Sequence, residues 1–455
     1  MNLDIITAKF IDQVIKRKTY ASREELINCV HDMQKIISEN KDKTPQEMIS
    51  ILIAKDVALL ETIKEEYKYP GYSIGVSTGN IDVRLMGGDL GGSNRIKMDD
   101  NALFDIASMT KFYTQIIIYN LISENVFNFN TKVRDLDDSF IDLGDLTVGD
   151  ITSFETTFKT NGRISDFKTI DEAQNCLHTT QVVETGKYNY NDIGMMIMKE
   201  VVEKVTKRSF QELLQDYVLD PADLKETYLI VPEPKKIFTT GSANAEFGEV
   251  NDPKSVALGG FSGHAGIFTT TADLLKFGNK LFDDSLIPRD LLKDAYQSGS
   301  KDIRGKMGNT YVSHPLGLDK TYVDKTESLD SFAIQGSTRT QSNFGENKVY
   351  TIFLNPASMS IEQAKEIEKR INYENSLKEE PGREVRIVEE FNFIRDNKDI
   401  QRKMIDARYL APIGKTTDLI DKSVSALALN LEFLNFYIKA YEHNFNEEIR
   451  VTHTM

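Results

Sequence analysis

The chain has 455 residues, 40% of them hydrophobic, so it can bury more than one core, and its length predicts two or three domains. A formal net charge of -15 argues against nucleic acid or an anionic membrane as the main partner. No run of residues is apolar over the length of a membrane span, and the first residues lack the basic start and apolar core of a secretory signal. We therefore expect a cytoplasmic protein, or an extracytoplasmic one if a signal has been removed.

Two kinds of local pattern precede the first candidate site. Residues 1–66 are rich in Lys, Glu, Ile and Leu at helical spacing, which predicts two or three amphipathic helices. From Gly71 to Leu85 apolar and polar residues alternate, and the glycine-rich run 87–92 then breaks the pattern, which predicts two strands joined by turns. No helix follows that run at the spacing of a dinucleotide-binding loop, so a hairpin or strand end is the better interpretation.

Ser108 and Lys111 stand three residues apart at the start of an apolar stretch that predicts a buried helix from Ser108 to about Glu124. Residues at this spacing share a helix face, so the lysine amine can reach the serine hydroxyl. Burial disfavours a charged lysine and lowers its pKa, which would let Lys111 accept the serine proton near neutral pH. The alternative is that Ser108 is only the N-cap of the helix, because Ser-x-x-Lys also occurs by chance.

The wider sequence around this pair resembles that of a known family. The stretch from Pro70-Gly-Tyr-Ser-Ile-Gly-Val to Asp105-Ile-Ala-Ser-Met-Thr-Lys is similar to the opening of the serine β-lactamase and penicillin-binding-protein-like family, in its class C and esterase branch. The resemblance implies that Ser108 forms an acyl-enzyme. We expect no cofactor and no metal.

A second stretch, Tyr190-Asn191-Asp192, resembles the Tyr-x-Asn segment of the same family. The resemblance implies that Tyr190 relays a proton between Ser108 and the leaving group. Asp192 replaces an amide by a carboxylate, which when ionised only accepts hydrogen bonds and would hold Lys111 charged. The alternatives are that Tyr190 is a half-buried aromatic with its hydroxyl in water, and that Asp192 is the N-cap of a helix at 193–204.

A third stretch, Asp252-Pro-Lys-Ser-Val-Ala-Leu-Gly-Gly-Phe-Ser-Gly-His-Ala-Gly-Ile-Phe, is similar over its length to a signature of this family. Its glycines permit backbone conformations that other residues reach only with strain, which predicts a tight loop before a helix at Ala272. His264 is a candidate base, but a single histidine without a partner is more often a hydrogen-bonded structural residue. We therefore expect His264 to be structural.

The last family motif is incomplete in this chain. Where the family carries Lys-Thr-Gly or His-Thr-Gly on a strand that lines the site, the best match here is Ile334-Gln335-Gly336. The glycine is present and the cation is absent, so turnover of substrates that carry a carboxylate is in doubt. Arg339 is a candidate for the missing charge, although strand alternation leaves its direction open. The resemblance implies that Gly336 lines the site and that the Ser337 backbone N–H is the second oxyanion donor.

We predict an α/β (α+β) protein in which an antiparallel sheet is flanked by helices and joined to an all-helical lobe, with the site in the cleft between them. The expected divisions are a helical N-terminal extension, the serine hydrolase domain and a mostly helical C-terminal extension, at residues 1–66, 67–356 and 357–455. Within the middle division, the α/β part is expected at about 67–130 and 240–356, and the helical lobe at about 131–239. Cys29 and Cys176 lie far apart without metal-ligand spacing, so neither a metal site nor a disulfide is expected.

Three functional hypotheses follow. The first is a serine hydrolase that acts on a small-molecule or peptide acyl substrate, ester or amide, with Ser108, Lys111 and Tyr190 as catalytic residues and Asp192, Gly336 and Ser337 around the oxyanion and substrate. The second is a non-catalytic descendant that binds a peptide or ligand in the same cleft, which the Ile334 substitution favours. The third is a scaffold whose terminal helices mediate self-association or partner binding. The presence of all three catalytic residue types favours the first.

Overall fold

The computed structural model describes residues 3–17, 23–67, 70–79, 81–91, 96–187, 189–240, 247–288, 290–291, 311–312, 332–336, 340–345, 348–354, 433–434 and 436–438. Ser337, Arg339 and nearly all of the predicted C-terminal extension lie outside these residues. None of the helices in the described part of the chain combines the length and the apolar character that a membrane crossing requires.

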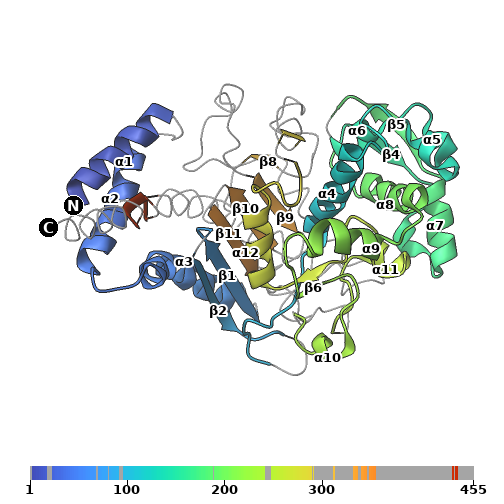
Figure 1. The fold of residues 1–455 in the computed structure, drawn as a ribbon. Coiled ribbons are helices and arrows are strands. Elements are labelled where there is room, and N and C mark those ends of the chain that lie inside the picture. The colour runs from blue at the N-terminus through green and yellow to red at the C-terminus, as the bar shows by residue number, and fades with distance from the viewer. Residues whose placement is uncertain are drawn as a thin grey trace, which may run out of the picture.

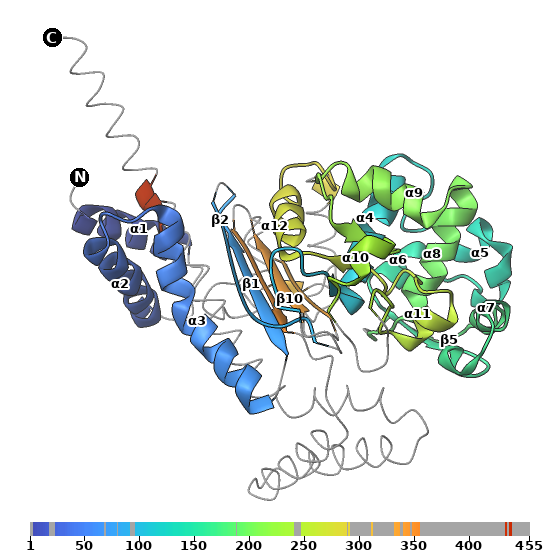
Figure 2. The same ribbon diagram turned by 90° about the horizontal axis from the view of Figure 1, so that it is seen from below.

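Three helices form the N-terminal part of the chain on one side of the sheet, and the third of them packs against the strands (Figures 1 and 2). They are α1 (Leu3–Arg17), α2 (Arg23–Glu39) and α3 (Pro45–Tyr67). Apolar residues at helical spacing bury one stripe of each helix, and those stripes meet in a shared core that also contains Phe433 and Leu434. The sequence pattern of residues 1–66 predicted two or three helices, and the structure has three there.

A six-stranded antiparallel sheet occupies the middle of the molecule (Figure 1). Its strand order is β2-β1-β11-β10-β9-β8. The strands are β1 (Gly71–Ser77), β2 (Asp82–Gly88), β8 (Tyr311–Val312), β9 (Phe332–Gly336), β10 (Thr340–Gly345) and β11 (Lys348–Leu354). The first and last long strands pair along their length, with Tyr72 opposite Leu354 and Ser77 opposite Val349, so chain segments far apart in sequence close the sheet.

The alternation of side chains along β1 sends two different sets of residues to the two faces of the sheet. Tyr72, Ile74 and Val76 join the core formed with the N-terminal helices. On the opposite face, the Ser73 hydroxyl lies 2.6 Å from the Thr271 hydroxyl of α12 (Thr271–Lys280). At Gly75 a Cβ atom would lie 2.5 Å from Thr271 Cγ2, so the glycine permits this close approach. Helices therefore cover both faces of the sheet (Figure 2).

The helical lobe lies on the far side of α12 from the N-terminal helices (Figure 1). Its helices are α4 (Thr110–Ser123), α5 (Val133–Leu136), α6 (Val148–Thr152), α7 (Ile170–His178), α8 (Ile193–Thr206) and α9 (Phe210–Leu214). Short helical turns and a hairpin complete it: η2 (Asp138–Leu143), η3 (Ile164–Asp166), the π-helical η4 (Gln215–Leu219), β4 (Thr156–Lys159) and β5 (Gln181–Thr185). The remaining elements join the lobe to the sheet: β3 (Phe104–Asp105), η1 (Ala107–Met109), β6 (Thr227–Tyr228), α10 (Glu233–Lys236), α11 (Pro253–Ala257) and β7 (Phe268–Thr269).

The predicted fold class is confirmed, since an antiparallel sheet flanked by helices is joined to a helical lobe. The predicted central helix is also present, because α4 is buried along nearly all of its length. Its start differs from the prediction. A 3-10 turn, η1, carries Ser108, and α4 itself begins at Thr110, with no side-chain cap from Ser108.

Candidate active site

Ser108 lies on a turn that is held by a buried carboxylate. Ala107, the preceding residue, has a φ of 43°, a left-handed conformation that is unusual for a residue with a side chain. The Asp105 carboxylate accepts hydrogen bonds from the Ala107 amide at 2.8 Å and from the Asn251 amide at 2.9 Å. Because Asp105 accepts hydrogen bonds from both segments, it offsets the free-energy cost of the strained turn at Ala107. It also holds this turn against the segment at Asn251 that leads into α11.

Lys111 is completely buried and lies among four oxygen atoms. Its ammonium nitrogen donates to the Ser108 hydroxyl at 2.8 Å and to the Tyr190 hydroxyl at 2.8 Å. It also lies 3.5 Å from the His264 carbonyl oxygen and 2.7 Å from Asp192 Oδ1. The structure therefore brings Ser108, Lys111 and Tyr190 together, with the lysine between the two hydroxyl groups.

The protonation state of Lys111 decides between two sequence-based expectations, a neutral lysine that accepts the serine proton and a lysine that Asp192 holds charged. Burial alone disfavours its charge, as predicted, but the Asp192 carboxylate and the Tyr190 oxygen outweigh burial and raise the pKa of Lys111 above its ordinary value. Lys111 is thus an ammonium at neutral pH and donates hydrogen bonds rather than accepting the serine proton. The first expectation is wrong because it considered burial without the ion pair, and the second agrees with the contact between Lys111 and Asp192.

Asp192 is the counter-ion of Lys111, and its side chain does not cap α8. Its backbone occupies the N-cap position, but its side chain makes no capping hydrogen bond. The Asn191 side chain does so instead, accepting from the Gly194 amide at 3.0 Å. Burial opposes the charge of Asp192, yet the cations of Lys111 and Lys254, with His264 nearby, hold its pKa well below the usual range.

Tyr190 presents its ring partly to solvent and its hydroxyl to the site. Its side chain is 44% exposed, and the ring stacks on buried Phe154 with 5.4 Å between centroids and an interplanar angle of 5°. The alternative of a hydroxyl in water is wrong, because that oxygen is bonded to Lys111. Stacking on Phe154 holds one face of the ring.

His264 is structural in its contacts, as expected. It is buried, and its Nδ1 lies 2.8 Å from the Ser262 hydroxyl while its Nε2 lies 3.0 Å from Asp252 Oδ1. The glycine beside it, Gly263, has a φ of 79°, and a Cβ there would lie 2.5 Å from the Met195 carbonyl oxygen. The predicted tight loop therefore packs directly on α8, and it carries the His264 carbonyl to Lys111.

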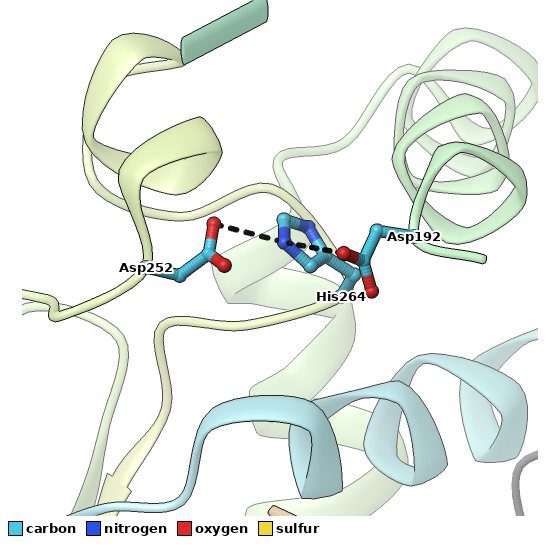
Figure 3. A group of neighbouring side chains, drawn as sticks. All are labelled: Asp192, Asp252 and His264. Carbon is cyan, nitrogen blue, oxygen red and sulfur yellow. Dashed lines mark hydrogen bonds and ion pairs between the residues drawn. The ribbon is translucent and has the colours of Figure 1, made fainter. Parts of the chain in front are cut away.

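Asp192, Asp252 and His264 converge closely enough to suggest a metal site (Figure 3). Their ligand atoms lie within 4.8 Å of one another. However, the Lys254 ammonium already lies 2.9 Å from Asp192 Oδ2 and 3.6 Å from Asp252 Oδ2, and both ring nitrogens of His264 have hydrogen-bond partners. The Lys254 ammonium thus forms ion pairs with both carboxylates, and the cluster is better described as an ion-pair network.

The incomplete motif lies on β9, which runs beside the turn that carries Ser108. Ile334 is in register with Ser342 of β10, and Gly336, the last residue of β9, is in register with Thr340. The proposed oxyanion donor Ser337 and the candidate cation Arg339 lie outside the described residues. Within the described residues, the second ammonium near the site comes from Lys254 on α11 and not from β9.

Sequence reasoning missed three residues around this site: Asp105, Asp252 and Lys254. Each contacts a site residue or its turn through the fold. All three stand in stretches that carry the family resemblance, but none was singled out there as a site residue. A local signal existed for Asp252, since Asp before Pro is typical of a helix start, and Asp252 does cap α11 through the Lys254 and Ser255 amides. No local pattern places the Lys254 ammonium beside Asp192.

Comparisons with known proteins agree with this arrangement. The sequence matches the family Beta-lactamase over residues 57–352, and the chain belongs to that family. Among solved structures it is similar to a class C β-lactamase from Rhodobacter sphaeroides, with a TM-score of 0.54 and 15% identity over 68% of this chain and 95% of the other. This likeness concerns the fold.

Curated relatives include a penicillin-binding protein and a protein named as a hydrolase. Penicillin-binding protein 4 of Amycolatopsis lactamdurans is 22% identical over 242 residues, which are 50% of this chain and 63% of the relative. The teichoic acid D-alanine hydrolase of Staphylococcus aureus is 26% identical over 151 residues, which are 32% of this chain and 38% of the relative. This chain spans less than two thirds of these relatives' lengths.

Proposed function

We propose that this protein is a serine hydrolase that cleaves an ester or amide of a small-molecule or peptide substrate through an acyl-enzyme on Ser108. The observation that carries the proposal is the contact of one buried ammonium with both hydroxyl oxygens, at 2.8 Å from Ser108 and 2.8 Å from Tyr190. An arrangement of nucleophile, cation and second hydroxyl at hydrogen-bond distance is what acyl transfer requires.

In the proposed acylation, Ser108 Oγ bonds to the substrate carbonyl carbon and loses its proton. Because the ion pair with Asp192 raises the pKa of Lys111, the lysine stays charged, and the Tyr190 oxygen is the proposed proton acceptor. The Lys111 ammonium balances the negative charge as it moves between the two oxygens. The bond to the leaving group then breaks, and Tyr190 returns the proton to that group.

In the second half of the reaction, water replaces the leaving group. The Tyr190 oxygen takes a proton from the water, whose oxygen bonds to the acyl carbon. The bond to Ser108 Oγ breaks, and the proton passes back to the serine. Backbone amides of Ser108 and Ser337 are the proposed oxyanion donors, a role that needs no particular side chain.

The missing cation at Ile334 favours an uncharged or apolar acyl group over a substrate with a terminal carboxylate. Isoleucine supplies neither charge nor a hydrogen bond, so a carboxylate there would lose its water without compensation. We therefore propose an esterase-like preference. The same substitution supports the second candidate function, a protein that binds a peptide or ligand in the cleft without turning it over.

The test is the intact mass of the protein after incubation with a fluorophosphonate and, separately, with a penicillin. The proposal expects one fluorophosphonate adduct, which Ser108→Ala loses. A penicillin adduct on the same serine would point to cell-wall-like acyl substrates. If neither probe labels the protein, the hydrolase proposal fails and the binding function is preferred.

A further inference from the structure

The Asp192 carboxylate joins two ammonium groups. Its Oδ1 lies 2.7 Å from Lys111, and its Oδ2 lies 2.9 Å from Lys254. Because the Asp192 side chain makes no capping bond to α8, these ion pairs are its principal contacts, with His264 Nε2 farther off at 3.9 Å. The orientation of the carboxylate toward Lys111 therefore depends on what holds Oδ2.

Lys254 is itself held firmly. Asp252 caps α11, and its Oδ1 accepts from the Lys254 amide at 2.9 Å, while Oδ2 lies 3.6 Å from the Lys254 ammonium. The same carboxylate binds His264 at 3.0 Å, and His264 in turn binds Ser262. The backbone amide and the side-chain ammonium of Lys254 thus both contact Asp252, which is largely buried. These two contacts fix the position of the ammonium.

We propose that Lys254 is a positioning residue for the acyl-transfer site: it fixes the Asp192 carboxylate, which in turn fixes the Lys111 ammonium against Ser108 and Tyr190. The charges alternate along Asp252, Lys254, Asp192 and Lys111, so each carboxylate lies between or beside cations. A lone carboxylate with one partner could rotate or draw water toward the buried lysine. The second ammonium prevents both.

This role also predicts a change in pH dependence. The groups facing Lys254 are Asp192 before α8, Asp252 before α11, His264 in the glycine-rich loop and, beyond Asp192, Lys111 on α4. Burial raises the pKa of Asp192, and the positive charge of Lys254 contributes to lowering it, after Lys111 and His264. Removing the Lys254 charge raises that pKa, and the acid limb of the acylation rate, which needs an ionised Asp192, moves to higher pH.

The test compares three variants by fluorophosphonate labelling rate across pH. Lys254→Met removes the charge and keeps the stem, and we expect about 10- to 100-fold slower labelling together with the shifted acid limb. Lys254→Arg restores the charge and should label within a few-fold of the unmodified protein. Lys235→Met is the matched control, because Lys235 pairs with Glu226 at 2.8 Å and is 33% exposed, against 31% for Lys254.

A crystal structure of Lys254→Met gives a readout that does not need activity. The positioning role of Lys254 rests on the proposed hydrolase function only where labelling rates are the measurement. We expect the Asp192 carboxylate to turn and its distance to Lys111 to lengthen. The inference is overturned if that contact stays at 2.7 Å, or if Lys254→Met labels like the unmodified protein. If the unmodified protein is not labelled at all, the hydrolase proposal fails, and the crystal structure alone decides the role of Lys254.

Discussion

The Lys111 ammonium lies 2.7 Å from Asp192 Oδ1, in a position where the lysine side chain has no exposure to solvent. This contact determines the charge of the group that touches Ser108. A buried lysine without a carboxylate tends to lose its proton, whereas this one is paired and keeps it. The proposed mechanism therefore assigns proton acceptance to Tyr190 and charge balance to Lys111.

Asp192→Asn removes the negative charge from this contact and keeps a hydrogen-bond acceptor. The amide oxygen can still accept from Lys111, but the main influence that raises the lysine pKa is lost, so burial lowers that pKa. We expect the alkaline limb of the labelling rate to move to lower pH, because less of Lys111 remains an ammonium. The measurement is the fluorophosphonate rate constant between pH 5 and about pH 10. An unchanged profile would show that the charge of Asp192 does not govern Lys111.

Lys111→Ala should remove acylation and leave the fold in place. The loss should be about 10²- to 10⁴-fold, as expected for a group that assists proton transfer. The fold should persist because Asp192 keeps Lys254 as a partner, at 2.9 Å, and no unpaired carboxylate is left behind. Labelling rate and thermal unfolding, measured on the same preparation, check both parts. Ordinary acylation in this variant would exclude Lys111 from the mechanism.

Asp105→Asn should change how stability depends on pH. Burial raises the pKa of Asp105 to about 6, and Asp252 adds to the effect, while hydrogen bonds from Asn251 and Ala107 oppose it. Since this value exceeds that of an ordinary aspartate, the folded protein binds the proton more tightly than the unfolded chain. The free energy of unfolding therefore falls as pH rises from about 4 to about 6, by about 3 kcal/mol from this group.

Asparagine does not titrate, so the variant should lack that part of the slope. Chemical denaturation at several pH values, for both proteins, gives the difference directly. Burial also raises the pKa of Asp273. Because Asp273 is present in both proteins, its contribution to the pH dependence cancels when the two stability curves are compared. Parallel stability curves between pH 4 and about pH 7 would contradict a raised pKa at Asp105.

Ile334→His restores a residue type that the family carries at this place on β9. If Ile334 lines the substrate site, the histidine can donate a charged hydrogen bond to a carboxylate, and reaction with a β-lactam reporter should rise about tenfold near pH 6. Gln335→His is the matched control, because neighbouring strand residues lie on opposite faces. No gain from Ile334→His would count against our alignment of this strand with the family motif.

The sequence was sufficient for the parts of the site that depend on local spacing. Ser108 and Lys111 are three residues apart, and the predicted reach between them is confirmed at 2.8 Å. The family resemblance placed Tyr190 beside them, and the structure has it there. The layered fold was also predictable, because the alternation in β1 and the apolar run of α4 are both local patterns.

The charge state of the site was only partly predictable, because the sequence suggested that Asp192 holds Lys111 charged but did not indicate the role of Lys254. It depends on Asp192 and Lys254, which approach Lys111 from α8 and α11 through tertiary packing. The strain at Ala107 and its support by Asp105 likewise arise from how the turn meets Asn251. Such contacts join segments that no periodicity connects. Apart from the pair of Asp192 with Lys111, sequence patterns could therefore list the charged residues but could not pair them.

The N-terminal helices have a practical consequence for work on this protein. Tyr72, Ile74 and Val76 on β1 are buried against the core that α1, α2 and α3 provide. The family match begins at residue 57, within α3, so cutting the chain at that boundary would divide a helix and uncover an apolar face of the sheet. A chain shortened in this way should aggregate on expression. Truncation for crystallisation should therefore retain residues 3–67, even though the reacting groups lie on the other side of the sheet.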